Sequence, residues 1–176
     1  MSVERAEAVT LRGTPYTLVG SELKVGDRAP DFVTVGQDLK PVSLSDTGGK
    51  LRVFSVVPSL DTPVCDVMTR RFNQEAARFP QVQIYTVSMD LPFAQSRWCA
   101  SAGVDHVIML SDHRDASFAR GFGTLIKELR LESRAIFVVD HKDVIRHVQY
   151  VAEIADPPDY DAVLEAVQKL VEESAG

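Results

Sequence analysis

The sequence is poor in cysteine, in long apolar stretches and in basic runs, and each shortage excludes a class of protein. Only two of the 176 residues are cysteine, too few for the disulfide framework of a small secreted domain. No apolar stretch approaches the roughly 20 residues that a membrane-spanning helix needs. Acidic residues outnumber basic ones by 25 to 19, and no basic run is present. We therefore expect neither a membrane nor a nucleic acid as a partner.

The N-terminal segment also lacks the continuous apolar region of a secretory signal peptide. Two of its first seven residues, Glu4 and Glu7, are acidic. We therefore expect a cytoplasmic protein, whose cysteines are kept reduced on average. In that compartment a disulfide between the two cysteines, Cys65 and Cys99, is expected to be transient and catalytic rather than structural.

What is present predicts an ordinary globular protein. Hydrophobic residues make up 45% of the chain and charged residues 25%, which is typical of such proteins. A chain of 176 residues can bury a sizeable core without a disulfide. Because no linker, internal repeat or low-complexity tract divides the sequence, we expect a single domain over residues 1–176.

Apolar periodicity and turn residues predict an α/β order of elements. An N-terminal β-hairpin is expected over residues 8–19, around Gly13. The further expected strands are 32–35, 41–44, 51–57, 82–88, 107–110, 135–139 and 144–150, and the expected helices are 64–79, 92–102, 115–121 and one containing 163–171. The β-α-β unit over 51–88 predicts parallel pairing of its strands. This order is that of a thioredoxin-like α/β fold with an N-terminal β-hairpin extension.

Cys65 lies where α/β folds place their sites, between a central strand and the helix that follows it. In the first turn of that helix, unpaired backbone N–H groups and the positive end of the helix dipole favour a thiolate. The alternative interpretation is a small buried hydrophobic residue. The position of Cys65 alone leaves both interpretations open.

Two other cysteine motifs fit poorly. A dithiol oxidoreductase needs a second cysteine three residues after the first, where this chain has Met68. The spacing from Cys65 to Arg71 matches that of thiol phosphatases. However, the five residues between them include no glycine to shape an anion-binding loop, and Asp66 among them repels phosphate.

The segment Pro58–Cys65, PSLDTPVC, resembles the Pro-x-x-x-Thr-x-x-Cys signature of peroxiredoxins. A second segment, Asp90–Cys99, with the sequence DLPFAQSRWC, is similar to the thiol peroxidase subfamily, the atypical two-cysteine peroxiredoxins. The resemblance extends from the N-terminal hairpin to Asp159 and Tyr160, and so covers nearly the whole chain.

The resemblance implies a role for five residues. Cys65 corresponds to the peroxidatic nucleophile, which becomes a sulfenic acid, and Cys99 to the resolving cysteine, which forms an intramolecular disulfide with it. Thr62 offers its hydroxyl to the sulfur and the peroxide, and it is also a candidate helix N-cap. Arg134 supplies a cation to the thiolate and the departing oxygen, although without the resemblance it predicts an exposed strand end. Pro58 shields the site from water, or simply ends the strand.

The resemblance further implies a hydroperoxide substrate, thioredoxin as the reductant, a homodimer built around the active-site end, and no metal or organic cofactor. The four histidines show no zinc-ligand spacing. Phe93 and Trp98 either line an apolar entrance for organic hydroperoxides or pack a helix. Two alternatives remain: a redox-sensing module that uses the same two cysteines, and a thioredoxin-fold scaffold in which they are inert.

Overall fold

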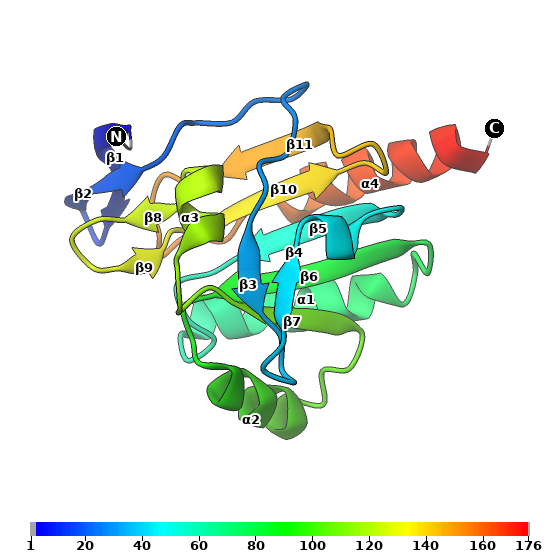
Figure 1. Cartoon of the computed structure of the whole chain (residues 1–176), viewed down its shortest axis with the longest axis horizontal. Coiled ribbons are helices and arrows are strands. Elements are labelled where there is room, and N and C mark those ends of the chain that lie inside the picture. Colours follow the sequence, from blue (N-terminus) through cyan, green and yellow to red (C-terminus); the bar gives the residue numbers. More distant parts are fainter. Residues whose placement is uncertain (1–2, 176) are drawn as a thin grey trace.

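The computed structural model describes residues 3–175 and is built on a seven-stranded sheet (Figure 1). The strand order is β11-β10-β5-β6-β7-β3-β4. In chain order these strands are β3 (Val33–Val35), β4 (Pro41–Ser43), β5 (Leu51–Val56), β6 (Val82–Ser88), β7 (Val107–Ser111), β10 (Ala135–Val139) and β11 (Ile145–Tyr150). The central strands β5, β6 and β7 are parallel, and their other neighbours are antiparallel. The parallel pairing predicted for β5 and β6 is confirmed.

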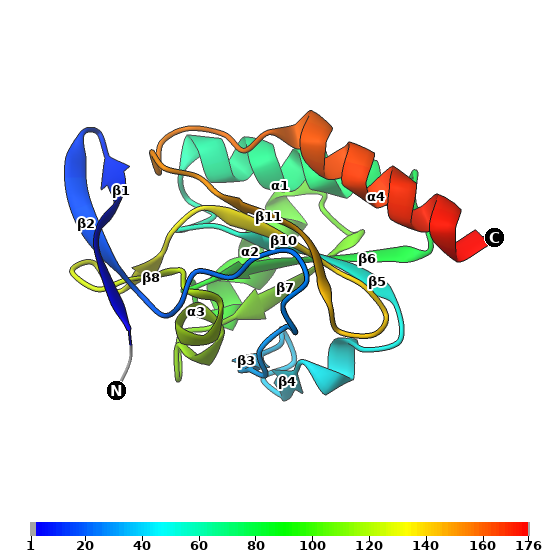
Figure 2. The ribbon, with the colours of Figure 1, turned by 90° about the horizontal axis from the view of Figure 1, so that it is seen from above.

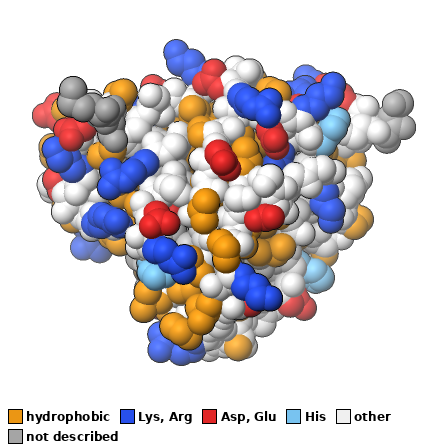
Figure 3. Space-filling model, in the orientation of Figure 1, with side chains coloured by type: hydrophobic (Ala, Val, Ile, Leu, Met, Phe, Trp, Pro, Cys, Tyr) orange, Lys and Arg blue, Asp and Glu red, His pale blue; other side chains and the backbone are white. Residues whose placement is uncertain are grey.

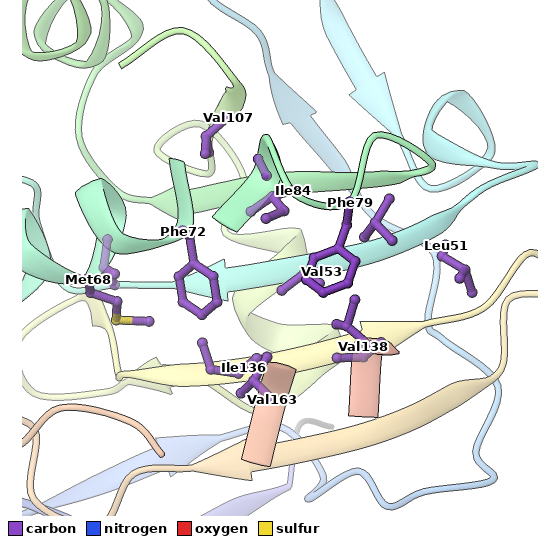
Figure 4. Packing of buried hydrophobic residues seen from close by; sticks show 14 of the residues in the cluster. Leu51, Val53, Met68, Phe72, Phe79, Ile84, Val107, Ile136, Val138 and Val163 are labelled. Carbon is purple, nitrogen blue, oxygen red and sulfur yellow. The ribbon is translucent and has the colours of Figure 1, made fainter. Parts of the chain in front are cut away.

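The helices are α1 (Pro63–Ala76), α2 (Pro92–Ala102), α3 (Ser117–Phe122) and α4 (Tyr160–Ala175), with a 3₁₀ turn at Ser45–Thr47. Figure 2 shows α1 and α4 on one face of the sheet and α3 on the other. Between α1, α4 and the sheet lies one apolar core, which includes Phe72, Ile136 and Val163 (Figure 4). A second core on the opposite face is rich in phenylalanine and includes Phe54 and Phe118. The sheet is therefore covered on both faces, as its parallel centre requires.

The N-terminal hairpin, β1 (Glu4–Leu11) and β2 (Thr14–Val19), belongs to a second, four-stranded sheet. Two very short strands complete it, β8 (Leu125–Ile126) and β9 (Leu131–Glu132). The hairpin turn at Arg12 and Gly13 has positive φ angles of 52° and 84°, as a tight two-residue turn requires. The hairpin also bonds to the segment after β11, because Thr10 N–H donates to the Ala152 carbonyl at 2.8 Å.

The predicted thioredoxin-like fold with an N-terminal hairpin is confirmed, and several predicted boundaries are corrected. The hairpin begins at Glu4 rather than at residue 8, because a register shift around Glu7, with φ 54°, interrupts the alternation of the strand. Helix α1 ends at Ala76 rather than 79. The last turn tightens there, because the Arg78 N–H donates to the Glu75 carbonyl and the Phe79 N–H to the Ala76 carbonyl, each three residues back. Strands β8 and β9 were not predicted, because two residues carry no periodicity.

Two observations concern the apolar residues of the helices and of the surface. Among residues 3–175, no helix combines the length and the apolar character that crossing a membrane demands. Hydrophobic side chains gather over α2 and β3 on the face shown in Figure 3. The exposed apolar residues of this region include Val33 of β3, Leu91 just before α2 and Phe93 within it.

Candidate active site

The candidate site lies where β5 ends and α1 begins. Pro58 follows β5, and Pro63 is the first residue of α1, a position at which its missing N–H costs nothing. Thr62 is the N-cap, and its Oγ1 accepts a hydrogen bond from the Cys65 N–H at 3.4 Å. Cys65 therefore lies in the first turn of α1, as predicted, and its side chain is fully buried.

The guanidinium of Arg134, a residue distant in sequence, contacts the sulfur of Cys65. Its Nη1 donates to Cys65 Sγ at 3.2 Å and contacts Met68 Sδ at 3.4 Å. Its Nε donates to the Ile154 carbonyl at 3.0 Å. Arg134 is only 2% exposed, so the exposed strand end expected without the family resemblance is wrong. The residue lies between β9 and β10, and its own carbonyl accepts a hydrogen bond from the Val151 N–H, which encloses it.

These contacts place positive charge beside the Cys65 sulfur. A buried charge needs a partner of opposite sign, and the guanidinium provides one in direct hydrogen-bond contact with Cys65. The first-turn N–H groups of α1 add a partial positive charge at the same place. A thiolate held in this way is a nucleophile, and the same cation can stabilise negative charge on an oxygen that leaves.

A cavity of about 340 Å³ opens onto this group. Pro58, Thr62 and Arg134 line it together with residues that are mostly apolar. The others are Leu11, Arg12, Pro63, Val64, Leu131, Ile154 and Ala155. The tip of the N-terminal hairpin thus forms one wall of the cavity. A larger hollow, of about 400 Å³, lies beside α4, and none of its lining residues contacts Cys65. The Cys65 side chain does not line the smaller cavity, but Thr62 and Arg134, which bond to Cys65, do, so we place the site there.

Cys99 lies apart from this cavity, on α2. It is half-buried and packs against the apolar core that also contains Cys65. Both thiols are free. Burial raises the pKa of the Cys99 thiol, and a hydrogen bond with Gln37 partly offsets this effect. Only Pro92 and Gln95 of α2 are buried, while Trp98, Cys99 and Ala102 pack against the core partly buried.

The structure thus brings together four of the five residues that the sequence singled out, Pro58, Thr62, Cys65 and Arg134. Met68, the second contact of Arg134, was not predicted from the sequence, although a residue three positions after Cys65 lies on the same helix face.

One further contact of Arg134 has no signal in the sequence, and the expected role of two aromatic residues in lining the cavity is corrected. The Ile154 carbonyl could not have been predicted, because a backbone acceptor leaves no trace in residue type. Phe93 and Trp98 do not line the cavity. Phe93 is instead 69% exposed.

Two further observations concern a tyrosine near the site and possible metal ligands. The pKa of Tyr160, at the start of α4, is raised by burial and lowered in part by the nearby Arg134 and Arg71. Among residues 3–175 no three histidine, cysteine, aspartate or glutamate side chains form a group suited to a metal ion.

Comparisons with known proteins identify the family of the chain. The redoxin family model matches residues 24–164. A thiol peroxidase from Oceanobacillus iheyensis is 56% identical over 92% of this chain and 98% of its own, and one from Bacillus subtilis is 52% identical over 93% and 98%. The crystal structure of a peroxiredoxin-like protein from Aquifex aeolicus superimposes with a TM-score of 0.86 at 43% identity, covering 94% of this chain and 98% of that one. The chain therefore belongs to the redoxin family and, within it, to the thiol peroxidases of the peroxiredoxin type.

Proposed function

We propose that the protein reduces hydrogen peroxide and organic hydroperoxides, with Cys65 as the peroxidatic thiolate and Cys99 as the resolving cysteine. The observation that carries this proposal is the 3.2 Å contact between the Arg134 guanidinium and Cys65 Sγ, beside an open cavity. A buried cation in contact with a buried sulfur stabilises that sulfur when it is an anion. A thiol peroxidase needs that anion as its nucleophile.

In the first step the Cys65 thiolate attacks the terminal oxygen of the hydroperoxide. An S–O bond forms and the O–O bond breaks, so that the sulfur loses two electrons and Cys65 becomes a sulfenic acid. The leaving oxygen takes the electron pair and then a proton, and departs as water or an alcohol. Arg134 and Thr62 line the cavity. Arg134 stabilises the charge on that oxygen, the Thr62 hydroxyl does so when it turns away from the Ser59 carbonyl to which it donates, and Pro58 keeps water away from the sulfur.

In the second step the Cys99 sulfur attacks the sulfur of the Cys65 sulfenic acid. The S–S bond forms as the S–O bond breaks, and the oxygen leaves as water. A disulfide needs Cα atoms roughly 4.4 to 6.8 Å apart, whereas the two cysteines lie on separate helices, α1 and α2. Most residues of α2 are only partly buried or exposed, which supports local unwinding as the way they meet. Thioredoxin then reduces the disulfide.

The lining of the cavity supports organic hydroperoxides as substrates alongside hydrogen peroxide. Leu11, Leu131 and Ile154 offer apolar contacts to an alkyl group, which hydrogen peroxide lacks. We therefore expect alkyl hydroperoxides to bind with a lower KM than hydrogen peroxide. Leu131→Asn should weaken this preference and leave the rate with hydrogen peroxide nearly unchanged.

The proposal also includes a homodimer built around the active-site end and a cytoplasmic location. Strands β5 and β6 end side by side, since Val56 pairs with Val87. Pro58 follows the first strand, and the exposed residues Leu91 and Phe93 follow the second, so exposed apolar surface lies at the active-site edge of the sheet. Sedimentation of the parent and of Phe93→Glu tests the dimer, which should weaken in the variant.

The coupled assay with thioredoxin, thioredoxin reductase and NADPH tests the function. The parent should consume NADPH when a hydroperoxide is added, Cys65→Ser should not, and Cys99→Ser should react with peroxide once without normal recycling. Slow turnover with retained disulfide formation would instead indicate a redox-sensing module. No reaction of either cysteine with peroxide would indicate an inert thioredoxin-fold scaffold.

A further inference from the structure

The carboxylate of Asp90 connects by hydrogen bonds the two segments that carry the cysteines. Asp90 lies between β6 and α2, two residues before the first residue of the Cys99 helix. Its Oδ1 accepts a hydrogen bond from Ser59 Oγ at 2.8 Å, and its Oδ2 accepts one from the Leu60 N–H at 2.9 Å. Oδ2 also accepts one from Ser88 Oγ at 2.8 Å.

These bonds reach Cys65 through the loop before α1. The Ser59 carbonyl accepts hydrogen bonds from the Thr62 hydroxyl, at 3.1 Å, and from the Thr62 N–H, at 3.4 Å. Thr62 Oγ1 in turn accepts from the Cys65 N–H. A continuous series of hydrogen bonds therefore runs from Asp90 through Ser59 and Thr62 to the first turn of α1.

The backbone of Asp90 is fixed as well. Its carbonyl accepts a hydrogen bond from Ser111 Oγ at 2.6 Å, at the end of β7. Ser88, one of its carboxylate partners, also accepts a hydrogen bond from Gln95 of α2 at 3.1 Å. The carboxylate is thus held by the sheet and by the start of α2, while it holds the Cys65 loop.

We propose that Asp90 is a positioning residue that keeps the Cys65 loop folded for the reaction with peroxide and releases it for the disulfide step. The inference rests on the proposed function. Hydrogen bonds to an ionised acceptor are stronger than neutral ones, so Asp90 favours the folded loop over the unwound one. The folded loop is the form that presents Thr62 and Cys65 to the peroxide, and the unwound loop is the form that lets Cys65 reach Cys99.

This role predicts opposite changes in the two chemical steps. Asp90→Asn removes the charge and replaces one carboxylate oxygen by an NH₂ group. That group cannot accept from the Leu60 N–H, and turned toward Ser59 it can only donate to the hydroxyl. The loop then spends more time unwound. The reaction of Cys65 with peroxide should slow by about tenfold, the effect of losing one charge-assisted hydrogen bond, while the conversion of sulfenic acid to disulfide becomes faster. A shorter-lived sulfenic acid is also less readily oxidised to sulfinic acid.

Rapid mixing of the reduced, full-length protein with hydrogen peroxide tests the inference. The fluorescence of Trp98, the single tryptophan and the neighbour of Cys99, follows the two steps, and mass spectrometry of quenched samples identifies the products. Asp61→Asn is the matched control, because Asp61 lies in the same loop with its side chain exposed. Asp90→Glu, which restores the carboxylate, should recover part of the parent behaviour. Ser59→Ala should resemble Asp90→Asn and replaces it if that variant does not fold.

A slower peroxide step together with a faster disulfide step supports the inference. Parent rates for both steps in Asp90→Asn or Ser59→Ala overturn it, as does an equal slowing of both steps, which would indicate general damage to the site. A parent protein whose Cys65 does not react with peroxide at all contradicts the proposed function instead, so the two failures are distinguishable.

Discussion

Replacing Arg134 by methionine should remove the charge that faces the Cys65 sulfur while keeping a side chain of similar length. Arg134 and Cys65 are 2% and 0% exposed, so water does not replace the lost charge easily. At an effective dielectric constant of about 20, two unit charges at the observed 3.2 Å attract each other by about 5 kcal/mol. A hydrogen bond to a charged group alone is worth about 1.5–3 kcal/mol.

These limits predict that about 2 to 4 kcal/mol of transition-state stabilisation is lost, or a rate with peroxide that is roughly 30- to 900-fold lower at neutral pH. Rapid mixing of the reduced variant with peroxide measures this rate. Ultraviolet absorbance of the thiolate against pH separates lost ionisation from lost reactivity. At a pH where Cys65 is fully ionised, the variant should still react more slowly, because the leaving oxygen also loses its cation.

The Arg134→Met variant needs a control, because the loss of the guanidinium also leaves the Ile154 carbonyl without its hydrogen-bond donor. Arg134→Lys keeps the charge but replaces a fork that makes two separate bonds by a single ammonium. Its rate should therefore fall less than that of Arg134→Met, and urea unfolding should show both variants folded. An Arg134→Met protein with the parent rate and the parent thiolate titration would refute this reasoning.

Three further predictions concern the cap, a buried acid and the disulfide. Thr62→Val removes the N-cap acceptor and should lower the free energy of unfolding by about 1 kcal/mol in urea titrations and slow the peroxide step, whereas Thr62→Ser should preserve both. The pKa of the fully buried Glu132 is raised well above 4.5 by burial and by the nearby Asp112, so the unfolded chain releases this proton near pH 4.5 while the folded protein retains it. Stability should therefore fall as the pH rises above that value, and Glu132→Gln should flatten this fall. Disulfide formation should increase hydrogen exchange over residues 64–68 and 96–102, while 53–57 stay protected.

Each of these three predictions has a contrary outcome. Equal activity and stability in Thr62→Val and the parent would show that the hydroxyl does not matter. Glu165→Gln is the control for the buried acid, because Glu165 is exposed on α4, and an identical pH slope in both glutamine variants would contradict the assignment to Glu132. Unchanged exchange at the two cysteine segments after oxidation would rule out local unwinding.

The sequence predicted those parts of the molecule that depend on repeated local patterns. The apolar run that forms β5 and the spacing of Met68 and Phe72 on α1 are periodic signals that survive in the structure. The bend at Glu7 and the two-residue strands β8 and β9 could not be predicted, because they depend on pairing with distant residues.

The residues of the site also fall into two groups, those that a local motif predicts and those that only the fold brings together. Cys65 and Thr62 are close in sequence, so the local motif placed both on one helix turn, as the structure does. Arg134 is 69 residues from Cys65, and without the family resemblance its type and neighbours predicted an exposed position. The Ile154 carbonyl and the Asp90 carboxylate act through contacts that only the folded chain creates, so neither was assigned a role from the sequence.

The most direct test of the account is the fate of the two sulfurs when the fully reduced protein receives one equivalent of hydroperoxide. Peptide mass spectrometry under non-reducing conditions should find one disulfide, between Cys65 and Cys99 of the same chain. In Cys99→Ser, a sulfenic-acid trapping reagent should label Cys65 alone. Oxidation that starts at Cys99, or a Cys65 that remains a free thiol while peroxide is consumed, would contradict the account.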